Sequence, residues 1–210
     1  MGYAYDLIEQ LEEKKYSYYY DKKGCVVVHE WGDVYIKVKR IDERIIFENK
    51  GGVEVDSLNP LPDGLRFNNK GDVYIIGEFQ IPYDIEFNNE GSVQFDPGST
   101  LPEGIVFNNK GDIWLEDVND LPENVTFNNE GEINLSTFTK IPASTKFNEK
   151  NGDIFLNSLK SVSPEIQFHN RGILVLGKID PRAREGWKGS VPGIDDKRLI
   201  NFMIKKGLFI

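Results

Sequence analysis

Acidic side chains recur at a fixed interval through the middle of this chain, and carboxylates spaced in this way could hold a cation. Asp112, Glu132 and Asp153 follow one another at intervals of about twenty residues. Like charges stacked side by side repel each other, so lysines, a cation or a basic partner would have to offset them. The structural alternative is that turn carboxylates accept backbone N–H groups. The multi-ligand loop that Ca²⁺ needs is missing, and we therefore expect no metal and no cofactor.

Two further sets of residues could support catalysis. Asp96 and Glu116 have the same spacing, which on stacked units approaches the ~5–5.5 Å between the carboxyl groups of a retaining glycosidase. The sequence places neither in an apolar pocket that would raise its pKa. Cys25 is expected on an inward column and His29 on the column of Asn109, with no third group to orient them. We predict no catalytic residue and no enzymatic activity.

Aromatic residues form a column of their own. They occupy the outward position of a predicted strand in every second unit, about 10 Å apart if the units stack at strand spacing. They are Tyr35, Tyr74, Trp114 and Phe155. Aromatic residues favour strands for packing reasons alone, but a solvent-facing stripe of them also has the composition of an interface. We predict a partner-binding face here, with Trp114 as its main contact.

These residues belong to a repeat of about twenty residues, which in one copy reads LPEGIVFNNKGDIWLEDVND. A fixed period of this length indicates a solenoid, in which each repeat forms one coil. Apolar residues alternate twice in each unit and predict two short strands, 105–108 and 113–115 in this copy. Gly111 lies in the bend between them, where we expect a positive φ. The predicted fold is all-β dominated: a single β-solenoid of about eight coils.

Stacked coils turn each repeat position into a column. An inward column of phenylalanines is expected from Phe47 to Phe168, as offset-stacked rings. The column from Asn49 to Asn170 is expected to form an asparagine ladder, with amides bonded from coil to coil. The next column, from Lys50 to Arg171, places mostly opposite charges on neighbouring coils, which would relieve charge repulsion.

The predicted organisation has three parts. Residues 1–22 form an N-terminal helix and a capping strand, 23–177 form the repeats, and 178–210 form a linker and a capping helix over 197–206. Caps are expected because the end coils of a solenoid otherwise expose strand edges.

Charge is distributed unevenly along the chain, whose net charge is -9. Residues 1–40 balance to zero, 41–177 carry -13 and 178–210 carry +4. An acidic rod repels nucleic acid and attracts basic protein surfaces. The start of the chain is too charged for a secretory signal, no apolar run is long enough for a membrane span, and the single cysteine fits a reducing compartment. We expect a cytoplasmic protein that binds neither nucleic acid directly nor membranes.

The Leu-Pro, Gly and Gly-Asp positions of LPEGIVFNNKGDIWLEDVND resemble those of the short leucine-rich-like repeat proteins of bacteriophages and mobile elements. The resemblance covers residues 41–177, and the ending 193–210 is similar to the helical tail of such proteins. It implies a phage or prophage interaction scaffold in the host cytosol, without catalytic residues. True leucine-rich repeats have asparagine where this chain has Val118, which argues against a curved horseshoe with outer helices.

Together these observations predict a non-enzymatic scaffold, phage-encoded, that inhibits a host defence or nucleic-acid-handling protein with a basic surface. In a sharper form of this hypothesis the rod competes with DNA for a basic groove. The alternatives are a structural or assembly component of a virion and a carbohydrate-active β-helix enzyme. The expected state is a monomer, or a homodimer formed end to end or side by side.

Overall fold

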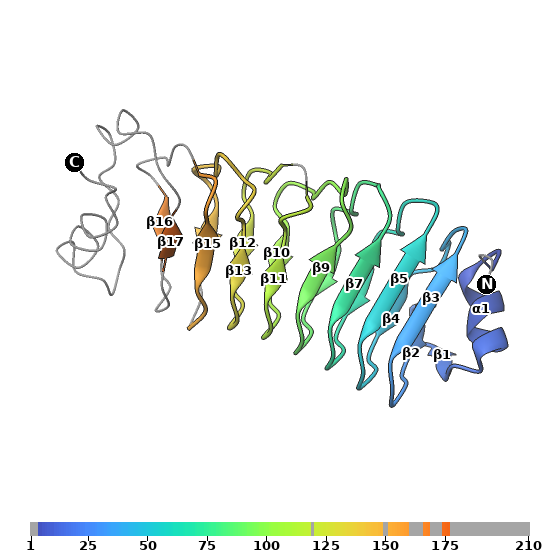
Figure 1. Ribbon diagram of the computed structural model, residues 1–210. Coiled ribbons are helices and arrows are strands. Elements are labelled where there is room, and N and C mark those ends of the chain that lie inside the picture. Colours follow the sequence, from blue (N-terminus) through green and yellow to red (C-terminus); the bar gives the residue numbers. More distant parts are fainter. Residues whose placement is uncertain (1–3, 119, 149–150, 160–165, 169–173, 177–210) are drawn as a thin grey trace, which may run out of the picture.

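The chain folds as a β-solenoid in which each repeat contributes one coil with two short strands (Figure 1). A computed structural model describes residues 4–118, 120–148, 151–159, 166–168 and 174–176. Within these residues eight strand pairs succeed one another, and the stacked parallel strands form a β-solenoid of about six turns. The predicted fold class is therefore confirmed.

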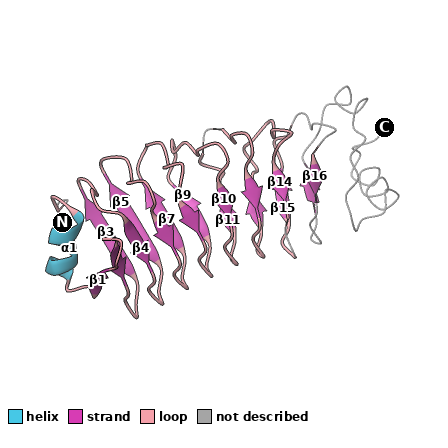
Figure 2. Ribbon diagram, turned by 180° about the vertical axis from the view of Figure 1, so that it is seen from behind, coloured by secondary structure: helices cyan, strands magenta, loops and turns pink. Residues whose placement is uncertain are grey.

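Two sheets run along the rod, and from β2 onward successive strands of the chain join the two sheets in turn (Figure 2). The nine-stranded sheet contains, in order, β1 (Tyr18–Tyr20), β2 (Val26–Val28), β4 (Ile45–Phe47), β6 (Arg66–Phe67), β8 (Glu86–Phe87), β10 (Val106–Phe107), β12 (Thr126–Phe127), β14 (Lys146–Phe147) and β16 (Gln167–Phe168). The eight-stranded sheet contains β3 (Val34–Val38), β5 (Val53–Ser57), β7 (Val73–Ile76), β9 (Val93–Phe95), β11 (Ile113–Trp114), β13 (Ile133–Asn134), β15 (Ile154–Leu156) and β17 (Leu174–Leu176). Neighbouring strands are parallel, except that β1 pairs antiparallel with β2.

The core lies between the two sheets and follows the predicted inward positions. Ile105 and Phe107 on one side, and Ile113 and Leu115 on the other, are buried. The ring of Phe107 stacks at 5.3 Å on Phe87 and at 5.4 Å on the next coil. The predicted phenylalanine stack is confirmed from the coil of β4 to that of β14, where each ring is fully buried. This regularity keeps the coils in register, so outward side chains also line up in columns.

A third set of buried residues closes the corner that follows the second strand. Val118 occupies this corner, and Phe138 and Leu159 do so in the next two coils. Val118, which stands where the leucine-rich pattern has asparagine, is therefore an apolar side chain that packs into the core. Among the described residues no helix lies between coils, in agreement with the expectation against outer helices.

Gly111 is required by close packing between coils and not by its own backbone angle. A Cβ at this position would lie 2.5 Å from the backbone nitrogen of Ser92 in the preceding coil, a distance that real contacts do not allow. Its φ is not positive, so the expected reason for this glycine was wrong. The left-handed position is Gly104, at φ 76°, and Asn124 takes the same conformation one coil later. Both residues occupy the turn after Leu-Pro, where a short polar side chain tolerates that conformation.

The predicted asparagine ladder exists, but one residue earlier than expected. Asn109 is 1% exposed, and its Nδ2 donates within its own turn to the carbonyl of Gly111 at 2.9 Å. The coil-to-coil amide bonds are in the adjacent exposed column, where Asn108 donates to Asn88 at 3.2 Å and Asn128 donates to Asn108 at 2.8 Å. The buried asparagine thus mainly holds its own bend, with a longer bond of 3.4 Å to the carbonyl of Gly91 in the preceding coil, while the exposed asparagines bond to one another from coil to coil. In the predicted charged column, Lys110 pairs with Glu90 at 3.3 Å.

The N-terminal segment caps the first coil, as predicted. Helix α1 (Leu7–Lys14) begins at Asp6, whose side chain accepts the N–H of Glu9 at 2.9 Å. Its Leu7 and Leu11 are buried against the first coil. The predicted strand and turn after the helix are also present, as β1 and the turn before β2.

The cap also satisfies the hydrogen-bonding edge of β3. The N–H of Tyr35 donates to the hydroxyl of Tyr16 at 3.1 Å, and the N–H of Lys37 donates to Oε1 of Gln10 at 2.6 Å. Ala4 then accepts the N–H of Lys39 at 2.9 Å. This coverage prevents pairing of the edge with another chain. The predicted C-terminal linker and helix, 178–210, lie outside the described residues.

Candidate functional site

The outward face of the eight-stranded sheet carries the predicted aromatic column. Backbone register places each aromatic residue beside a polar one, and the column reads Tyr35, Glu54, Tyr74, Gln94, Trp114, Asn134, Phe155 and Val175. The side chain of Tyr35 is 50% exposed, and the other three aromatic side chains are partly buried. The structure thus brings the four predicted residues onto one face, on alternate coils.

Polar contacts hold the two tyrosines of this column in place. The Tyr35 hydroxyl donates to Oδ2 of Asp33 at 3.4 Å, and Nε2 of Gln94 donates to the Tyr74 hydroxyl at 3.4 Å. Trp114 lies beside Gln94 in the register. These contacts restrict the orientations of the two tyrosine rings.

Asp112, Glu132 and Asp153 occupy one column, two positions before the aromatic column. Oδ1 of Asp112 accepts the backbone N–H of Glu132 in the next coil at 2.8 Å. The same bond joins Asp72 to Ser92 at 2.8 Å. The carboxylate of Asp112 therefore accepts a backbone N–H group, as the structural alternative to a cation site expected. Within the described part of the chain, no three His, Cys, Asp or Glu side chains converge in a way that could hold a metal ion.

Sequence reasoning missed a groove on this face, about 350 Å³ in volume, between Tyr35 and Tyr74. Glu54 lies between the two tyrosines in the register, and Asp33 and Asp72 line the groove beside it. None of the described residues that line it is basic. A signal for this groove was present in the sequence, because the segment DVYI, which supplies its aspartates and tyrosines, occurs at 33–36 and again at 72–75.

The electrostatic environment of the face is negative. The charge of Asp33 is the main cause that raises the pKa of the Tyr35 hydroxyl above its usual value. The pKa of Tyr74 is also raised, first by burial and then by the charges of Asp96, Asp117 and Glu54. A cation placed near these rings would favour the ionised hydroxyls and lower both pKa values.

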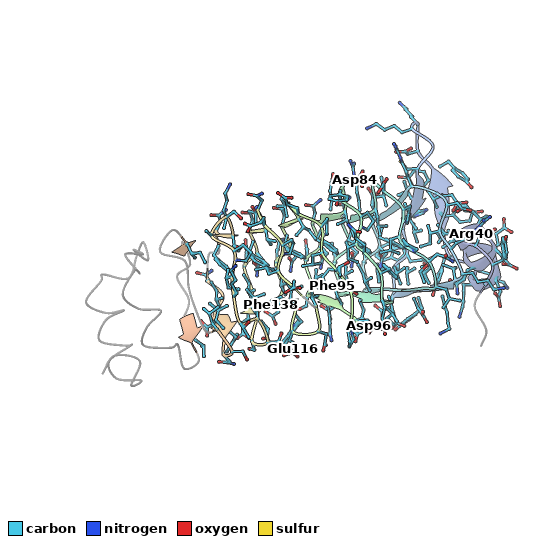
Figure 3. All side chains as sticks on the ribbon, turned by 90° about the horizontal axis from the view of Figure 1, so that it is seen from above. Arg40, Asp84, Phe95, Asp96, Glu116 and Phe138 are labelled. Atoms are coloured by element: carbon cyan, nitrogen blue, oxygen red, sulfur yellow. The ribbon has the colours of Figure 1, made fainter. Side chains whose placement is uncertain are left out.

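A second hollow, about 640 Å³ in volume, lies at the end of the same strands and is lined by Phe79, Ile76 and Asp96. Burial raises the pKa of the Asp96 carboxyl, and nearby carboxylates such as Asp56 add to the shift. The expectation that no pocket would raise this pKa was therefore wrong. In Figure 3, Asp96 and Glu116 lie on the same flank of the rod. Glu116 is exposed and accepts a hydrogen bond from Asn134 at 3.0 Å.

Cys25 and His29 are not brought together. The register pairs Val26 with Ile45 and Val28 with Phe47, one residue away from the predicted alignment of the first coil. Cys25 is buried as expected, whereas His29 is exposed and its ring contacts Tyr19 at 5.4 Å between centroids. His29 therefore lies in the column of the exposed asparagine ladder, ahead of its first asparagine, and not in the column of Asn109.

Comparison with protein-family models, with curated proteins and with solved structures finds no match to this chain. None of the helices in the described residues has the length and apolar character needed to cross a bilayer. The fold and site define the class of the molecule as a β-solenoid with an outward face that is both acidic and aromatic.

Proposed function

We propose that this protein is a non-enzymatic interaction scaffold that binds a partner with a basic surface through the outward face of the eight-stranded sheet. The carrying observation is the groove between Tyr35 and Tyr74, where two aromatic side chains and three carboxylates meet without a basic lining residue. Aromatic residues supply contact area at interfaces, and the carboxylates select a cationic partner. The net charge of -13 over residues 41–177 steers such a partner to the rod.

The resemblance to phage repeat proteins extends this proposal to a biological setting. In that setting the scaffold is phage-encoded and acts in the host cytosol, and the partner is a host defence or nucleic-acid-handling protein. Partial competition with DNA would follow if the partner's basic surface is its DNA-binding groove. A virion or assembly component is the alternative, and mass spectrometry of purified particles separates the two, because abundant copies in virions would favour the structural role.

The test compares three immobilised proteins as baits in a lysate of the host cell. They are the wild type, the double variant Tyr74→Ala/Trp114→Ala, and a control with Val106→Ala and Thr126→Ala on the outward face of the other sheet. We expect a basic protein that the wild type and the control capture but the double variant does not. Salt should release it between about 50 and 300 mM, where screening of exposed charges acts. Equal capture by the double variant, with an unchanged circular dichroism spectrum, would reject this face.

The absence of catalysis is part of the proposal and has its own test. Burial raises the pKa of the Asp96 carboxyl, the direction that favours an acid catalyst, so polysaccharide hydrolysis by the wild type is compared with that by Asp96→Asn. We expect no release of reducing sugar by either protein. Release by the wild type that is lost in the variant would replace the scaffold proposal with a glycosidase.

A further inference from the structure

On the outward face of the eight-stranded sheet, the pattern of side chains repeats every two coils and not every coil. Every second coil carries aspartate two positions before an aromatic residue. The four copies are Asp33-Val34-Tyr35, Asp72-Val73-Tyr74, Asp112-Ile113-Trp114 and Asp153-Ile154-Phe155. The coils between them carry Gly52-Val53-Glu54, Ser92-Val93-Gln94 and Glu132-Ile133-Asn134. The buried middle residue is apolar in all seven, so the alternation is confined to the outward side chains.

Coil-to-coil hydrogen bonds orient three of the four aspartates. Asp33, Asp72 and Asp112 each accept, through Oδ1, the backbone N–H of the following coil at 2.7–2.8 Å. That bond fixes the direction of the carboxylate, and in Asp33 the second oxygen, Oδ2, also accepts the hydroxyl of Tyr35 at 3.4 Å. Each aspartate directly precedes its strand, and Asp33 and Asp72 line the same groove as the aromatic residues two positions later, Tyr35 and Tyr74.

An aromatic ring beside a fixed carboxylate is a recognition unit for a cationic side chain. The ring attracts the cation through its face, and the carboxylate accepts a charge-assisted hydrogen bond. Arginine suits such a unit best, because its planar guanidinium both stacks on rings and bonds to carboxylates. The groove between Tyr35 and Tyr74 provides the space for one such head group.

The spacing of the units selects the backbone conformation of the partner. Parallel strands lie about 4.8 Å apart, so units on alternate coils repeat every ~9.6 Å. In a polyproline II helix, residues three apart lie on the same face and ~9.3 Å from each other. In an α-helix, seven residues span ~10.5 Å. This length exceeds the spacing of the units, and the difference accumulates over four units. In an extended strand, residues that lie on the same face are ~6.6 Å apart, so they do not coincide with units that repeat every ~9.6 Å.

We infer that the Asp-x-aromatic units of alternate coils bind an extended basic segment in polyproline II conformation, with arginine or lysine at every third position. The occupant follows from charge complementarity and from the spacing of the units. The inference rests on the proposed function, because it specifies which basic partner the same face accepts. Each cationic side chain lies against one ring and one carboxylate, and the residues between them face solvent.

Fluorescence anisotropy with labelled peptides tests this inference on the full chain at about 150 mM salt, where long-range attraction is largely screened. The matching peptide is Arg-Pro-Pro repeated four times, which favours polyproline II. A control of identical composition, Arg-Pro repeated four times followed by four prolines, changes only the spacing. We expect the matching peptide to bind at least about tenfold more tightly, because it engages several units at once.

Variants of the face identify the contacts. Asp72→Asn and Tyr74→Ala should each weaken binding of the matching peptide by about three- to fivefold, the effect of one cationic contact. Thr126→Ala on the other sheet is the matched control and should leave it unchanged. Circular dichroism of each variant confirms that the fold is retained, and Tyr74→Phe, which keeps the ring, should retain most of the affinity.

The outcomes separate this inference from the proposed function. Equal affinity for the two peptides, still reduced by Asp72→Asn and Tyr74→Ala, overturns the spacing but leaves an acidic, aromatic binding face. Tighter binding of an alanine-rich helical peptide with arginine at every seventh residue overturns the polyproline II conformation. Binding that no variant of the face changes rejects this face, and with it both proposals.

Discussion

Oδ1 of Asp112 accepts the backbone N–H of Glu132 at 2.8 Å, so that an acidic side chain of one coil holds the backbone of the next. Asp72 and Ser92 have the same relationship one repeat pair earlier. Stacking coils brings carboxylates of one column close together, and this bond offsets part of the repulsion by giving each aspartate a backbone donor.

Replacing Asp112 by alanine should lower the free energy of unfolding by about 1 kcal/mol, the usual contribution of one hydrogen bond. Asp112→Asn retains an acceptor and should lose less. The matched control is Glu132→Ala, which keeps the N–H that Asp112 binds. Urea denaturation measures all three variants, and a control loss equal to that of Asp112→Ala would contradict this role.

The glycines of each coil should divide into two classes on substitution by alanine. Gly111→Ala forces a Cβ against the backbone of the preceding coil, and we expect a loss of about 3 kcal/mol or more, at the upper end for overpacking. Gly104→Ala meets no atom within 4 Å, but its left-handed conformation should cost about 1–2 kcal/mol.

Gly104→Asn is the control for that comparison, because Asn124 adopts the same conformation at φ 61°. It should be destabilised less than Gly104→Ala. Thermal unfolding ranks the three variants, and a Gly111→Ala protein as stable as Gly104→Asn would show that neighbouring coils separate without cost.

The two neighbouring asparagines should differ in the same way. Asn109 is buried, and Asn109→Ala leaves the half-buried carbonyl of Gly111 without its donor, so we expect a loss of about 1–3 kcal/mol. Asn108→Ala removes exposed amide bonds that water can replace, with a loss of about 0.5 kcal/mol. Chemical denaturation of the two variants decides the order, and a larger loss for Asn108→Ala would favour the exposed ladder as the main link between coils.

Asp96 makes stability depend on pH. Burial raises the pKa of its carboxyl in the folded protein above the ordinary value of 3.8, so the folded state holds this proton more tightly than the unfolded chain does. The stability gained by protonation is complete below the unfolded pKa and is lost as pH rises through the folded pKa. Asp96→Asn should therefore raise Tm at pH 7.

That gain in Tm should shrink as the pH falls towards 3.8. Asp63→Asn, at an exposed turn position, is the control, and its Tm should differ little from the wild type at either pH. A Tm difference for Asp96→Asn that stays the same at every pH would show that packing, and not ionisation, causes it.

Most of the coil could be predicted from the sequence, because its signals are local. Alternation of apolar residues identified Ile105 and Phe107 as inward, and the twenty-residue period required that equivalent residues stack. The aromatic column followed from the same two facts, since a residue between two inward positions of a strand faces outward. The role of that column as a binding face stays a prediction.

Contacts between coils could not be predicted in this way. Asn108 and Asn109 are adjacent and of the same type, and only the packed bend shows that the second turns inward to Gly111 while the first donates to Asn88 in the preceding coil. His29 was misplaced because the first coil is degenerate, and a shift of one residue moves a side chain to the other face of a strand.

By itself the sequence determined the period, the two strands of each coil, the identity of the core columns and the acidic charge of the rod. The tertiary structure decided which atoms bond from coil to coil and why Gly111 has no side chain. It also decided where Glu54 meets Tyr35 and Tyr74 to form a groove. The reason is physical: inward and outward positions follow from spacing along one strand, whereas a groove or a coil-to-coil bond depends on the register of residues about twenty positions apart.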